Sequence, residues 1–496
     1  MNNKFSCVKT ITFKGWNILL TEVETSITGG LPIFSIVGLP NKTINESKER
    51  IRAVLSHLGI GLPVGRIIIN LSPAHITKEG THYDLPIIIG LLVALNIINI
   101  PHIDEYIFFG EINLKGLIIK TLGILPVGIF CFKNNYKILT SEQAQKELSL
   151  IADFNRYFLF KDIMNIIVFF KNYKEHSNYK KLPDKEIKPL YIFPKKEESI
   201  NIYLPKIYKR FMEIAALGNY NFLLVGPPGT GKTTLVKIFH KLLPLLKHEQ
   251  SLEVTSLYSI AGLLEEETLM DYPPLRIPHH SSSIYALLGG GIKPKPGEVS
   301  LANQGVLFLD ELSNFSSNIL DGLRECIEEK IVRISRVTYN ISYPANFQLV
   351  SAMNPCKCGF LGSKKKLCVC SSKTKEIYKN KISGPFLDRI PLYLYMEDIF
   401  YGESENQKEW IQTTREKIVK LRSKEITEQV ITENLLPIEK ETQCFINKYC
   451  EKYNISLRKY KYLLRIANTI KNLDGNDIIT KSQIGEAILF LNMYAK

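Results

Sequence analysis

A glycine-rich loop at residues 226–233, with the sequence GPPGTGKT, constrains this chain more than any other feature of its sequence. The loop follows a short apolar run, Phe222–Val225, and precedes a segment, 234–243, whose apolar residues have helical spacing. A strand, the pattern G-x-x-x-x-G-K-T and a helix, in that order, form a nucleotide-binding phosphate loop. Because the run before the loop is wholly apolar, it is typical of a parallel sheet covered on both faces. We therefore predict an α/β fold around this loop.

The chemistry of such a loop assigns roles to its residues. Glycines let the backbone approach phosphate oxygens closely, and successive N–H groups point inward. The N-terminus of the following helix adds positive potential. Lys232 is expected to neutralise charge on the β and γ phosphates of ATP, and Thr233 is expected to bind Mg²⁺. The predicted ATP-binding residues are Gly226, Pro227, Pro228, Gly229, Thr230, Gly231, Lys232, Thr233 and Thr234.

Two later apolar runs end in polar side chains that suit ATP hydrolysis. Val306–Leu309 is followed by Asp310, expected in the Mg²⁺ shell, and by Glu311, expected to polarise the attacking water as general base. Gln348–Met353 is followed by Asn354, whose amide is expected to orient water near the γ-phosphate. The order of these features along the chain matches a AAA+ module.

Composition sets the broader class of protein. The chain of 496 residues predicts about three domains. Its 45% hydrophobic and 23% charged residues exclude a disordered chain, a coiled coil and a collagen. The formal net charge of +14 is compatible with a polyanionic partner such as nucleic acid. A general enrichment in lysine would give the same charge without a binding surface, so charge alone leaves both explanations open.

No targeting or membrane segment is expected. Residues 1–14 are polar, and the most apolar run, 85–100, contains Pro86 and Asn96. This run is about 16 residues long, whereas a spanning helix needs about 20. We therefore interpret it as a buried core element, and we expect a cytoplasmic protein without a membrane partner.

Four of the nine cysteines are clustered, which in a cytoplasmic chain favours a metal site over disulfides. Cys356, Cys358, Cys368 and Cys370 form two C-x-C pairs, and four thiolates in tetrahedral geometry suit a structural Zn²⁺. The alternative is free thiols in an exposed loop, because C-x-C is tighter than the common C-x₂-C spacing. Lysines at 364–366 give the loop a basic tip suited to phosphate contacts.

Hydrophobic periodicity predicts mixed strands and helices before residue 172 and helices near the end of the chain. The polar segments 172–200 and 397–430 are expected to be exposed. The predicted elements are strands at 34–38 and 66–71, a helix over 42–58 capped by Asn41, and a helical segment over 437–496 in which Asn454 and Thr480 begin helices.

Together these motifs resemble the YifB/ComM family of magnesium-chelatase-like AAA+ proteins. The likeness rests on residues 31–40, 78–86, 277–281, 289–291, 295–302, 305–312, 354–359, 382–390, 456–458 and 467–470. It implies a homo-hexameric ring ATPase that acts on single-stranded or branched DNA, a branch-migration helicase of natural transformation and homologous recombination. The alternative is a chelatase-type or chaperone-like motor acting on a protein or metal-insertion partner, because magnesium-chelatase ATPase subunits share the AAA+ core.

The resemblance also implies a fold in three parts. These are a Lon-protease-like (S5-type) α+β domain, a AAA+ P-loop NTPase core and a helical lid. The implied boundaries are 1–171 for the Lon-like domain, 172–204 for a linker, 205–396 for the core with its cysteine loop at 356–370, 397–430 for a connector, and 431–496 for the lid.

Two arginines take roles from the resemblance. Arg389 matches the family's arginine finger, which contacts the γ-phosphate bound to a neighbouring subunit; the alternative is a surface ion pair with Asp388. Arg458 matches the second sensor on the lid, acting in its own subunit, and the alternative is solvent exposure on a basic helix. Pro391 departs from the acidic residue usual in the family, but it leaves Arg389 in place.

Residues 275–298 resemble an insertion of the family. We interpret them as a loop facing the pore of the ring, with Lys293 and Lys295 near DNA. His279 and His280 are adjacent rather than spaced for one face, so a structural role is favoured over metal binding. The prolines and a glycine triplet of this segment favour a shaped loop over a helix interior.

The Lon-like domain is expected to lack peptidase activity. Active Lon-type enzymes use a Ser–Lys pair, and the matching positions here fall on His82 and Leu125. Histidine does not supply the acylating hydroxyl, and leucine does not act as its base. Ser72 and Lys120 stay as nearby alternatives.

Overall fold

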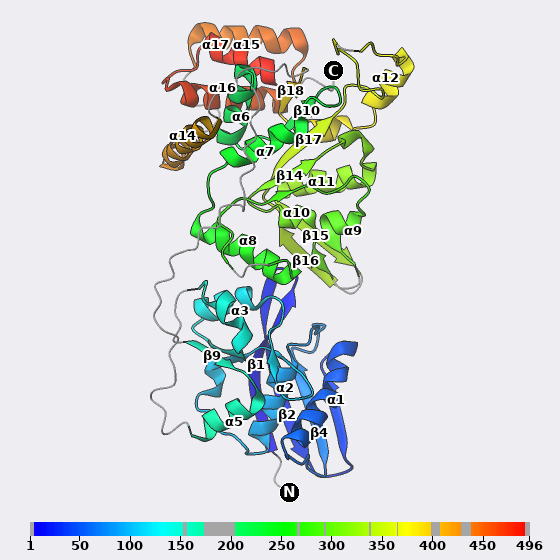
Figure 1. The fold of residues 1–496 in the computed structure, drawn as a ribbon, viewed down its shortest axis with the longest axis vertical. Helices are drawn as coiled ribbons and strands as arrows, with labels where there is room; N and C mark the ends of the chain where they lie inside the picture. The colour runs from blue at the N-terminus through cyan, green and yellow to red at the C-terminus, as the bar shows by residue number, and fades with distance from the viewer. Residues whose placement is uncertain are drawn as a thin grey trace. The chain divides into compact units, whose positions relative to one another are not determined.

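The computed structural model describes residues 4–151, 156–172, 204–264, 268–291, 294–336, 339–364, 366–397, 407–427 and 438–491. The chain divides into two compact units, which are described separately (Figure 1). Described residues of the first unit lie within 1–192, 251–270 and 337–342, and those of the second within 193–250, 271–336 and 343–496. The predicted linker falls almost wholly outside the described residues.

A mixed sheet, seven-stranded over the described residues, frames the first unit in the order β3-β4-β2-β1-β5-β8-β9. The β1–β2 and β2–β4 pairs are antiparallel, and the other neighbours are parallel. The strands are β1 Lys4–Lys14, β2 Asn17–Thr28, β3 Ile33–Val37, β4 Arg66–Ser72, β5 Tyr106–Phe108, β8 Lys137–Ser141 and β9 Tyr157–Phe160, with a separate pair, β6 Glu111–Ile112 and β7 Ile118–Ile119. The helices are α1 Lys42–His57, α2 Asp84–Ala94, α3 Ile124–Lys133, α4 Gln145–Leu148 and α5 Ile163–Lys171.

Helices cover both faces of this sheet. On β1, Val8 packs in a cluster with α1, α2 and α5, whereas Ile11 packs in a second cluster with α3 and α4. Val8 and Ile11 point to opposite faces because strand side chains alternate. The predicted strands are confirmed, and so is the first helix, whose cap Asn41 accepts the N–H of Ile44.

The apolar run at 85–100 forms α2 and the turn after it. Almost every residue of α2 is buried, as predicted for a core element. Within the described residues, no helix combines the length and the apolar character needed to cross a membrane.

The second unit is built on parallel strands, five in the described residues, in the order β11-β14-β17-β10-β18. They are β10 Phe222–Val225, β11 Leu275–Arg276, β14 Val306–Leu309, β17 Gln348–Met353 and β18 Leu392–Tyr395, and outside this sheet lie β12 Gly289–Gly290, β13 Lys295–Pro296, β15 Ile331–Arg336 and β16 Tyr339–Pro344. The helices that lie wholly in this unit are α6 Lys206–Leu217, α7 Lys232–Leu242, α9 Ile284–Leu288, α10 Glu298–Leu301, α11 Ser317–Glu329, α12 Ser372–Lys379, α13 Gly384–Leu387, α14 Gln407–Thr427, α15 Lys440–Tyr453, α16 Leu457–Asp474 and α17 Lys481–Phe490. Helix α8, His248–Ala261, and strand β16 have most of their residues in the first unit.

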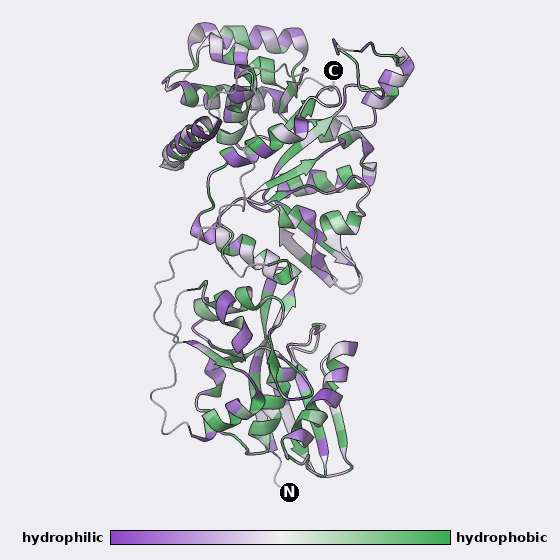
Figure 2. Cartoon of the chain, in the orientation of Figure 1, coloured by the Kyte–Doolittle hydropathy of each residue, from purple (hydrophilic) through white to green (hydrophobic). Residues whose placement is uncertain are grey.

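Two layers of helices enclose the parallel sheet. Phe222 and Phe308 pack on one face with α6, α7, α16 and α17, while Leu223 and Leu307 pack on the other with α11 and α13. Strands buried on both faces need continuous apolar sequence, and Figure 2 colours the strands of this sheet as hydrophobic. The predicted α/β fold is confirmed, and β10 and β14 have their predicted bounds.

The expectation of an exposed segment at 397–430 is wrong for its helical part. Helix α14 buries Ile418 completely, and Trp410 and Leu421 pack against the same cluster as α6 and α7. These apolar residues recur at helical spacing among many charges, so one stripe of α14 is covered while most of its surface is polar.

The final helices begin at positions that differ partly from those predicted. Asn454 ends α15 in the left-handed conformation, which asparagine adopts readily, and does not start a helix. Ser456 instead caps α16 by accepting the N–H of Lys459. Thr480 begins α17 as predicted, through a capping box with Gln483.

Candidate active site

The phosphate loop joins the carboxyl end of β10 to α7. Gly229 and Gly231 have φ angles of +79° and +80°, a conformation that favours glycine. A Cβ on Gly226 would lie 2.5 Å from the carbonyl oxygen of Met396. The backbone geometry therefore requires glycine at these positions. Helix α7 begins at Lys232, earlier than the predicted start at 234.

Lys232 bends back into the loop. Its Nζ donates to the carbonyl oxygens of Gly226 at 2.8 Å and Pro227 at 2.9 Å, and to Oδ1 of Asn354 at 3.2 Å. Burial lowers the pKa of this ammonium group, and the two carboxylates that follow β14 oppose the shift. A positive charge thus lies inside the loop, directly beside the strand-end amide.

Thr233 and Asp310 are in direct contact. The Thr233 hydroxyl donates to Oδ2 of Asp310 at 3.1 Å, and Oδ1 of Asp310 accepts the backbone N–H of Glu311 at 2.9 Å. A hydroxyl and a carboxylate side by side are oxygen ligands of the type that Mg²⁺ takes next to nucleotide phosphates. The two residues therefore fit the predicted magnesium site. In the loop itself, the buried hydroxyl of Thr230 donates to the carbonyl of Pro227 at 3.0 Å.

Glu311 has a left-handed backbone conformation, with φ of +52°, which is uncommon for a residue other than glycine. Its Oε2 accepts a hydrogen bond from Nδ2 of Asn314 at 2.9 Å and lies 3.6 Å from Nδ1 of His280. The turn thus holds the carboxylate of the expected general base between two polar side chains. The sequence did not predict either contact: His280 lies in the segment 277–281 that resembles the family, but no residue pattern pairs it or Asn314 with Glu311.

Asn354 is fixed through its backbone as well as its side chain. Its carbonyl oxygen accepts a hydrogen bond from the Tyr378 hydroxyl at 3.1 Å, and that hydroxyl accepts one from Ser313 at 2.9 Å. Burial raises the pKa of the Tyr378 phenol, so it stays protonated as a donor. Tyr378 was also not predicted, because nothing in the sequence of α12 marks it.

Three strand ends thus bring the predicted hydrolytic residues to one edge of the sheet. Contacts link Lys232 to Asn354 and Thr233 to Asp310, and Glu311 follows Asp310 directly. Of the other loop residues, Pro228 and Gly229 are exposed, and Thr234 is half-buried on the first turn of α7. The arrangement has the groups needed to bind a triphosphate with its metal ion and to activate water.

Arg389 and Arg458 share one ion-pair partner, which is not a residue of the phosphate loop. Nη2 of each guanidinium pairs with Oε1 of Glu328, at 2.6 Å from Arg389 and 2.9 Å from Arg458. Glu328 is on α11, and Arg458 is on the first turn of α16. Arg389 pairs with Glu328 instead of forming the alternative pair with Asp388. Arg458 is 45% exposed, as its alternative describes, and it also pairs with Glu328.

The four clustered cysteines converge. Their sulfur atoms all lie within 4.8 Å of one another, and Cys356 is 3.3 Å from Cys358 and 3.7 Å from Cys368. Sulfur atoms bound to one tetrahedral zinc ion at about 2.3 Å are about 3.8 Å apart. The backbone N–H of Phe360 lowers the pKa of Cys358 to about 6. Cys370 completes a donor set that can hold a metal ion.

The cysteine loop lies against the phosphate loop. A Cβ on Gly359, whose φ is +86°, would be 2.9 Å from Cδ of Pro228. At the tip, Lys364 pairs with Glu397 at 3.0 Å, and Lys366 lies over the ring of Phe360 at 4.9 Å. Residue 365 lies outside the described part of the chain.

The insertion at 275–298 contains the short helix α9 and the β12–β13 pair rather than a loop alone. The ring centroids of His279 and His280 lie 4.2 Å apart with the rings tilted, and Nδ1 of His279 contacts the Ser281 hydroxyl at 2.7 Å. Lys295 is exposed on β13, and residue 293 lies outside the described residues.

The peptidase positions of the first unit are occupied by buried side chains. His82 and Leu125 are both buried, and His82 contacts the carbonyl oxygen of Ile11 at 2.9 Å. Burial lowers the pKa of His82 to about 4. Lys120 lies 3.6 Å from the Glu147 carboxylate, and Ser72 lies at the end of β4.

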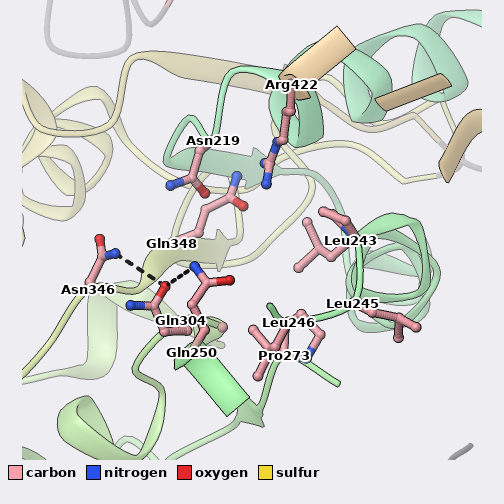
Figure 3. Close-up of a pocket in the computed structure, with 12 residues that line it drawn as sticks. Asn219, Leu243, Leu245, Leu246, Gln250, Pro273, Gln304, Asn346, Gln348 and Arg422 are labelled. Atoms are coloured by element: carbon pink, nitrogen blue, oxygen red, sulfur yellow. Dashed lines mark hydrogen bonds between the residues drawn. The ribbon is translucent and has the colours of Figure 1, made fainter. Parts of the chain in front are cut away.

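A hollow of about 180 Å³ lies at the amino ends of the strands of the parallel sheet in the second unit (Figure 3). Its wall is rich in amides: Oε1 of Gln304 accepts from Gln250 at 3.0 Å and from Asn346 at 3.4 Å, and Gln348 begins β17. The phosphate loop is at the carboxyl ends of the strands, so this hollow is not the nucleotide site.

The chain matches family models of the magnesium chelatase subunit ChlI and is similar to known proteins over almost its whole length. Models of the magnesium chelatase subunit ChlI match residues 201–403 and 23–143, and a model of its C-terminal part matches 404–490. Competence protein ComM of Haemophilus influenzae is 34% identical, with 95% of this chain and 94% of that protein covered. YifB of Escherichia coli is 34% identical, covering 98% of this chain and 96% of YifB. The chain belongs to the ComM/YifB family.

Membership of this family and the phosphate loop define the chain as a AAA+ ATPase with ATP and Mg²⁺ as its cofactors. Similarity to magnesium chelatase itself is more limited. The magnesium-chelatase 38 kDa subunit of Cereibacter sphaeroides is 29% identical, and the match covers 30% of this chain and 49% of that subunit.

Proposed function

We propose that this protein couples ATP hydrolysis to DNA remodelling, as a homo-hexameric helicase that drives branch migration of recombination intermediates. The observation that carries the proposal is its end-to-end similarity to competence protein ComM, which extends through the first unit as well as the ATPase unit. The net charge of +14 is compatible with a polyanionic partner. Cytoplasmic location follows from this function.

In the proposed reaction, Lys232 neutralises charge on the β and γ phosphates, while Thr233 and Asp310 hold the magnesium ion. The magnesium ion neutralises charge on the phosphates when it is bound. Glu311 accepts a proton from the attacking water, and Asn354 orients that water. Their contacts with one another at one sheet edge support these roles.

Arg389 completes the proposed site from the neighbouring subunit. A guanidinium group suits the charge that develops on the γ-phosphate, and it acts across a subunit boundary in other phosphoryl-transfer proteins. In this subunit Arg389 pairs with Glu328 rather than with the residues of the phosphate loop. That position supports a role toward nucleotide bound elsewhere.

The cysteine cluster is proposed to hold a structural Zn²⁺. The spacing of its sulfur atoms supports a tetrahedral thiolate site. A zinc ion there would stabilise the segment between the sensor Asn354 and α12, which is long and has little core of its own. Its role would be structural, without a place in hydrolysis.

The first unit is proposed to be a Lon-protease-like domain without peptidase activity, with boundaries at 1–171. A buried His82 at the nucleophile position supports this assignment, since its ring stacks on Phe109 and contacts the tilted ring of Tyr83. The proposed role of the domain is to support the ring or to contact DNA.

The second candidate is a chelatase-type or chaperone-like motor that acts on a protein or metal-insertion partner. The matches to magnesium chelatase models favour it. This candidate shares the ATP site and differs in the polymer or partner that stimulates hydrolysis.

The steady-state ATPase rate, measured with and without single-stranded and branched DNA, separates the two candidates. DNA is expected to stimulate hydrolysis, and the stimulation is expected to fall at higher salt because phosphate contacts release counterions. Lys232→Ala is the control, and it should abolish nucleotide binding and all hydrolysis. An active ATPase that is indifferent to every DNA would contradict the DNA-remodelling proposal.

A further inference from the structure

Glu328 is the shared partner of two arginines from different parts of the second unit. Its Oε1 lies 2.6 Å from Nη2 of Arg389 and 2.9 Å from Nη2 of Arg458. Two guanidinium groups on one carboxylate leave an excess of one positive charge. Burial raises the pKa of Tyr462, and the charges of Arg458, Arg465 and Arg389 lower it.

The hydrogen-bonding capacity of Arg389 is only partly used. Its side chain is 11% exposed, Nη1 donates to the carbonyl oxygen of Pro385 at 2.6 Å, and Nε is buried without a hydrogen-bond partner. A buried donor without an acceptor is uncommon in a folded protein. This donor, together with the excess charge, marks the cluster as a place for a further anion.

We propose that Glu328 is an internal counter-ion for an anion site on the subunit surface, and that a phosphate of nucleotide bound to a second copy displaces it. Carboxylate and phosphate bind guanidinium groups through the same forked geometry, so one can replace the other. Without that phosphate, Glu328 keeps the largely buried charge of Arg389 compensated. This inference rests on the proposed function, in which Arg389 acts on the neighbouring subunit.

Displacement would also change the link between α11 and the lid. The Glu328–Arg458 pair connects the end of α11 to the first turn of α16. When the phosphate displaces Glu328 from Arg389, the carboxylate also leaves Arg458, which breaks this connection and leaves Arg458 to its expected role in its own subunit. Glu328 is therefore a positioning residue that opposes nucleotide-dependent association until the second copy supplies its phosphate.

The test is self-association of the full chain as a function of protein concentration, by sedimentation, with ATP and magnesium on the hydrolysis-deficient Glu311→Gln background. Glu328→Gln in this background should lower the concentration for half-assembly about fivefold, the effect of losing one partly exposed competing charge pair. Glu329→Gln is the matched control: Glu329 is next to Glu328 on α11 but pairs with Arg333 at 3.2 Å. It should assemble as the parent does. Equal or weaker assembly of the Glu328 variant would overturn the proposal.

A double variant shows whether Glu328 acts through the arginines. Arg389→Ala should weaken assembly with ATP, and adding Glu328→Gln to it should restore little, because the two changes act on one interaction. An undiminished gain in the double variant would contradict the proposal. Binding of a fluorescent ATP analogue is measured in parallel on the Glu311→Gln protein. Absence of binding would count against the ATP site itself. Intact binding, with no change in assembly on Glu328→Gln, would count against this inference alone.

Discussion

At the scale of single residues, Glu311 combines an unusual backbone conformation with two polar neighbours. Glu311→Gln is expected to bind ATP with the affinity of the parent. Its rate of hydrolysis is expected to fall by at least about 10²-fold, because the amide does not accept the proton of water. A fluorescent ATP-analogue titration measures binding, and phosphate release measures hydrolysis. Hydrolysis at the parent rate would remove Glu311 from the role of general base.

His82 makes the stability of the first unit depend on pH. Burial lowers its folded-state pKa to about 4 from 6.5. At pH above 6.5 the imidazole is neutral in both the folded and the unfolded chain. Between pH 6.5 and 4 the unfolded chain binds a proton that the folded unit does not, so the free energy of unfolding falls, by up to about 3 kcal/mol.

His82→Gln tests this effect because glutamine does not titrate. Urea unfolding of parent and variant, measured at several pH values from 7 to 4, should show the smaller loss of stability in the variant. The difference between the two pH dependences isolates His82 from the other titrating groups. Parallel pH dependences would show that His82 is not responsible.

The sequence predicted the residues of the ATP site because each belongs to a local pattern. Lys232 lies in a phosphate loop, and Asp310 and Asn354 follow buried strands at the same sheet edge. The partners of these residues were not predictable in this way. Glu328 is one of several acids at the end of an amphipathic helix, and only the fold shows that it, rather than Glu329, contacts two arginines.

At the scale of elements, the cysteine loop connects a metal site to the phosphate loop. Cys356→Ser together with Cys368→Ser is expected to abolish zinc binding, because a tetrathiolate site then lacks two ligands. Metal analysis of the purified protein measures the zinc. Cys444→Ser, at an exposed cysteine outside the cluster, is the control and should retain it. Equal zinc in the double variant and the parent would contradict the zinc site.

The same double variant should weaken nucleotide binding to a lesser degree than Lys232→Ala does. Gly359 packs against Pro228, so disorder in the cysteine loop removes a support of the phosphate loop without removing a phosphate ligand.

The predicted ends of elements were most accurate for strands in which burial requires an apolar residue at every position. The strands β10 and β14 are covered on both faces, so their apolar runs gave both ends. Helix boundaries depended on capping, which the sequence leaves ambiguous. Asn454 suits both an N-cap and a left-handed C-cap, and the packing of α15 and α16 selects the second.

At the scale of the whole molecule, a finger that acts between subunits predicts complementation. Lys232→Ala and Arg389→Ala proteins should each be inactive, but a mixture should regain ATPase activity. A site is complete when its Lys232 comes from the Arg389→Ala protein and its Arg389 comes from the Lys232→Ala protein. Random mixing of equal amounts makes about a quarter of all sites complete. The ATPase rate as a function of mixing ratio measures this. No recovery in mixed assemblies would place Arg389 outside the neighbouring site.

The order of strands in the second unit has a consequence for how the protein is made. The strand before the phosphate loop, β10, lies between β17 and β18, and Val225 is translated about 170 residues before Tyr395. At 5–20 residues per second this interval lasts roughly 10–30 s. A nascent chain or a fragment that ends before β18 carries an apolar strand with one edge unpaired. The sheet that carries the phosphate loop is therefore complete only after its last strand has left the ribosome.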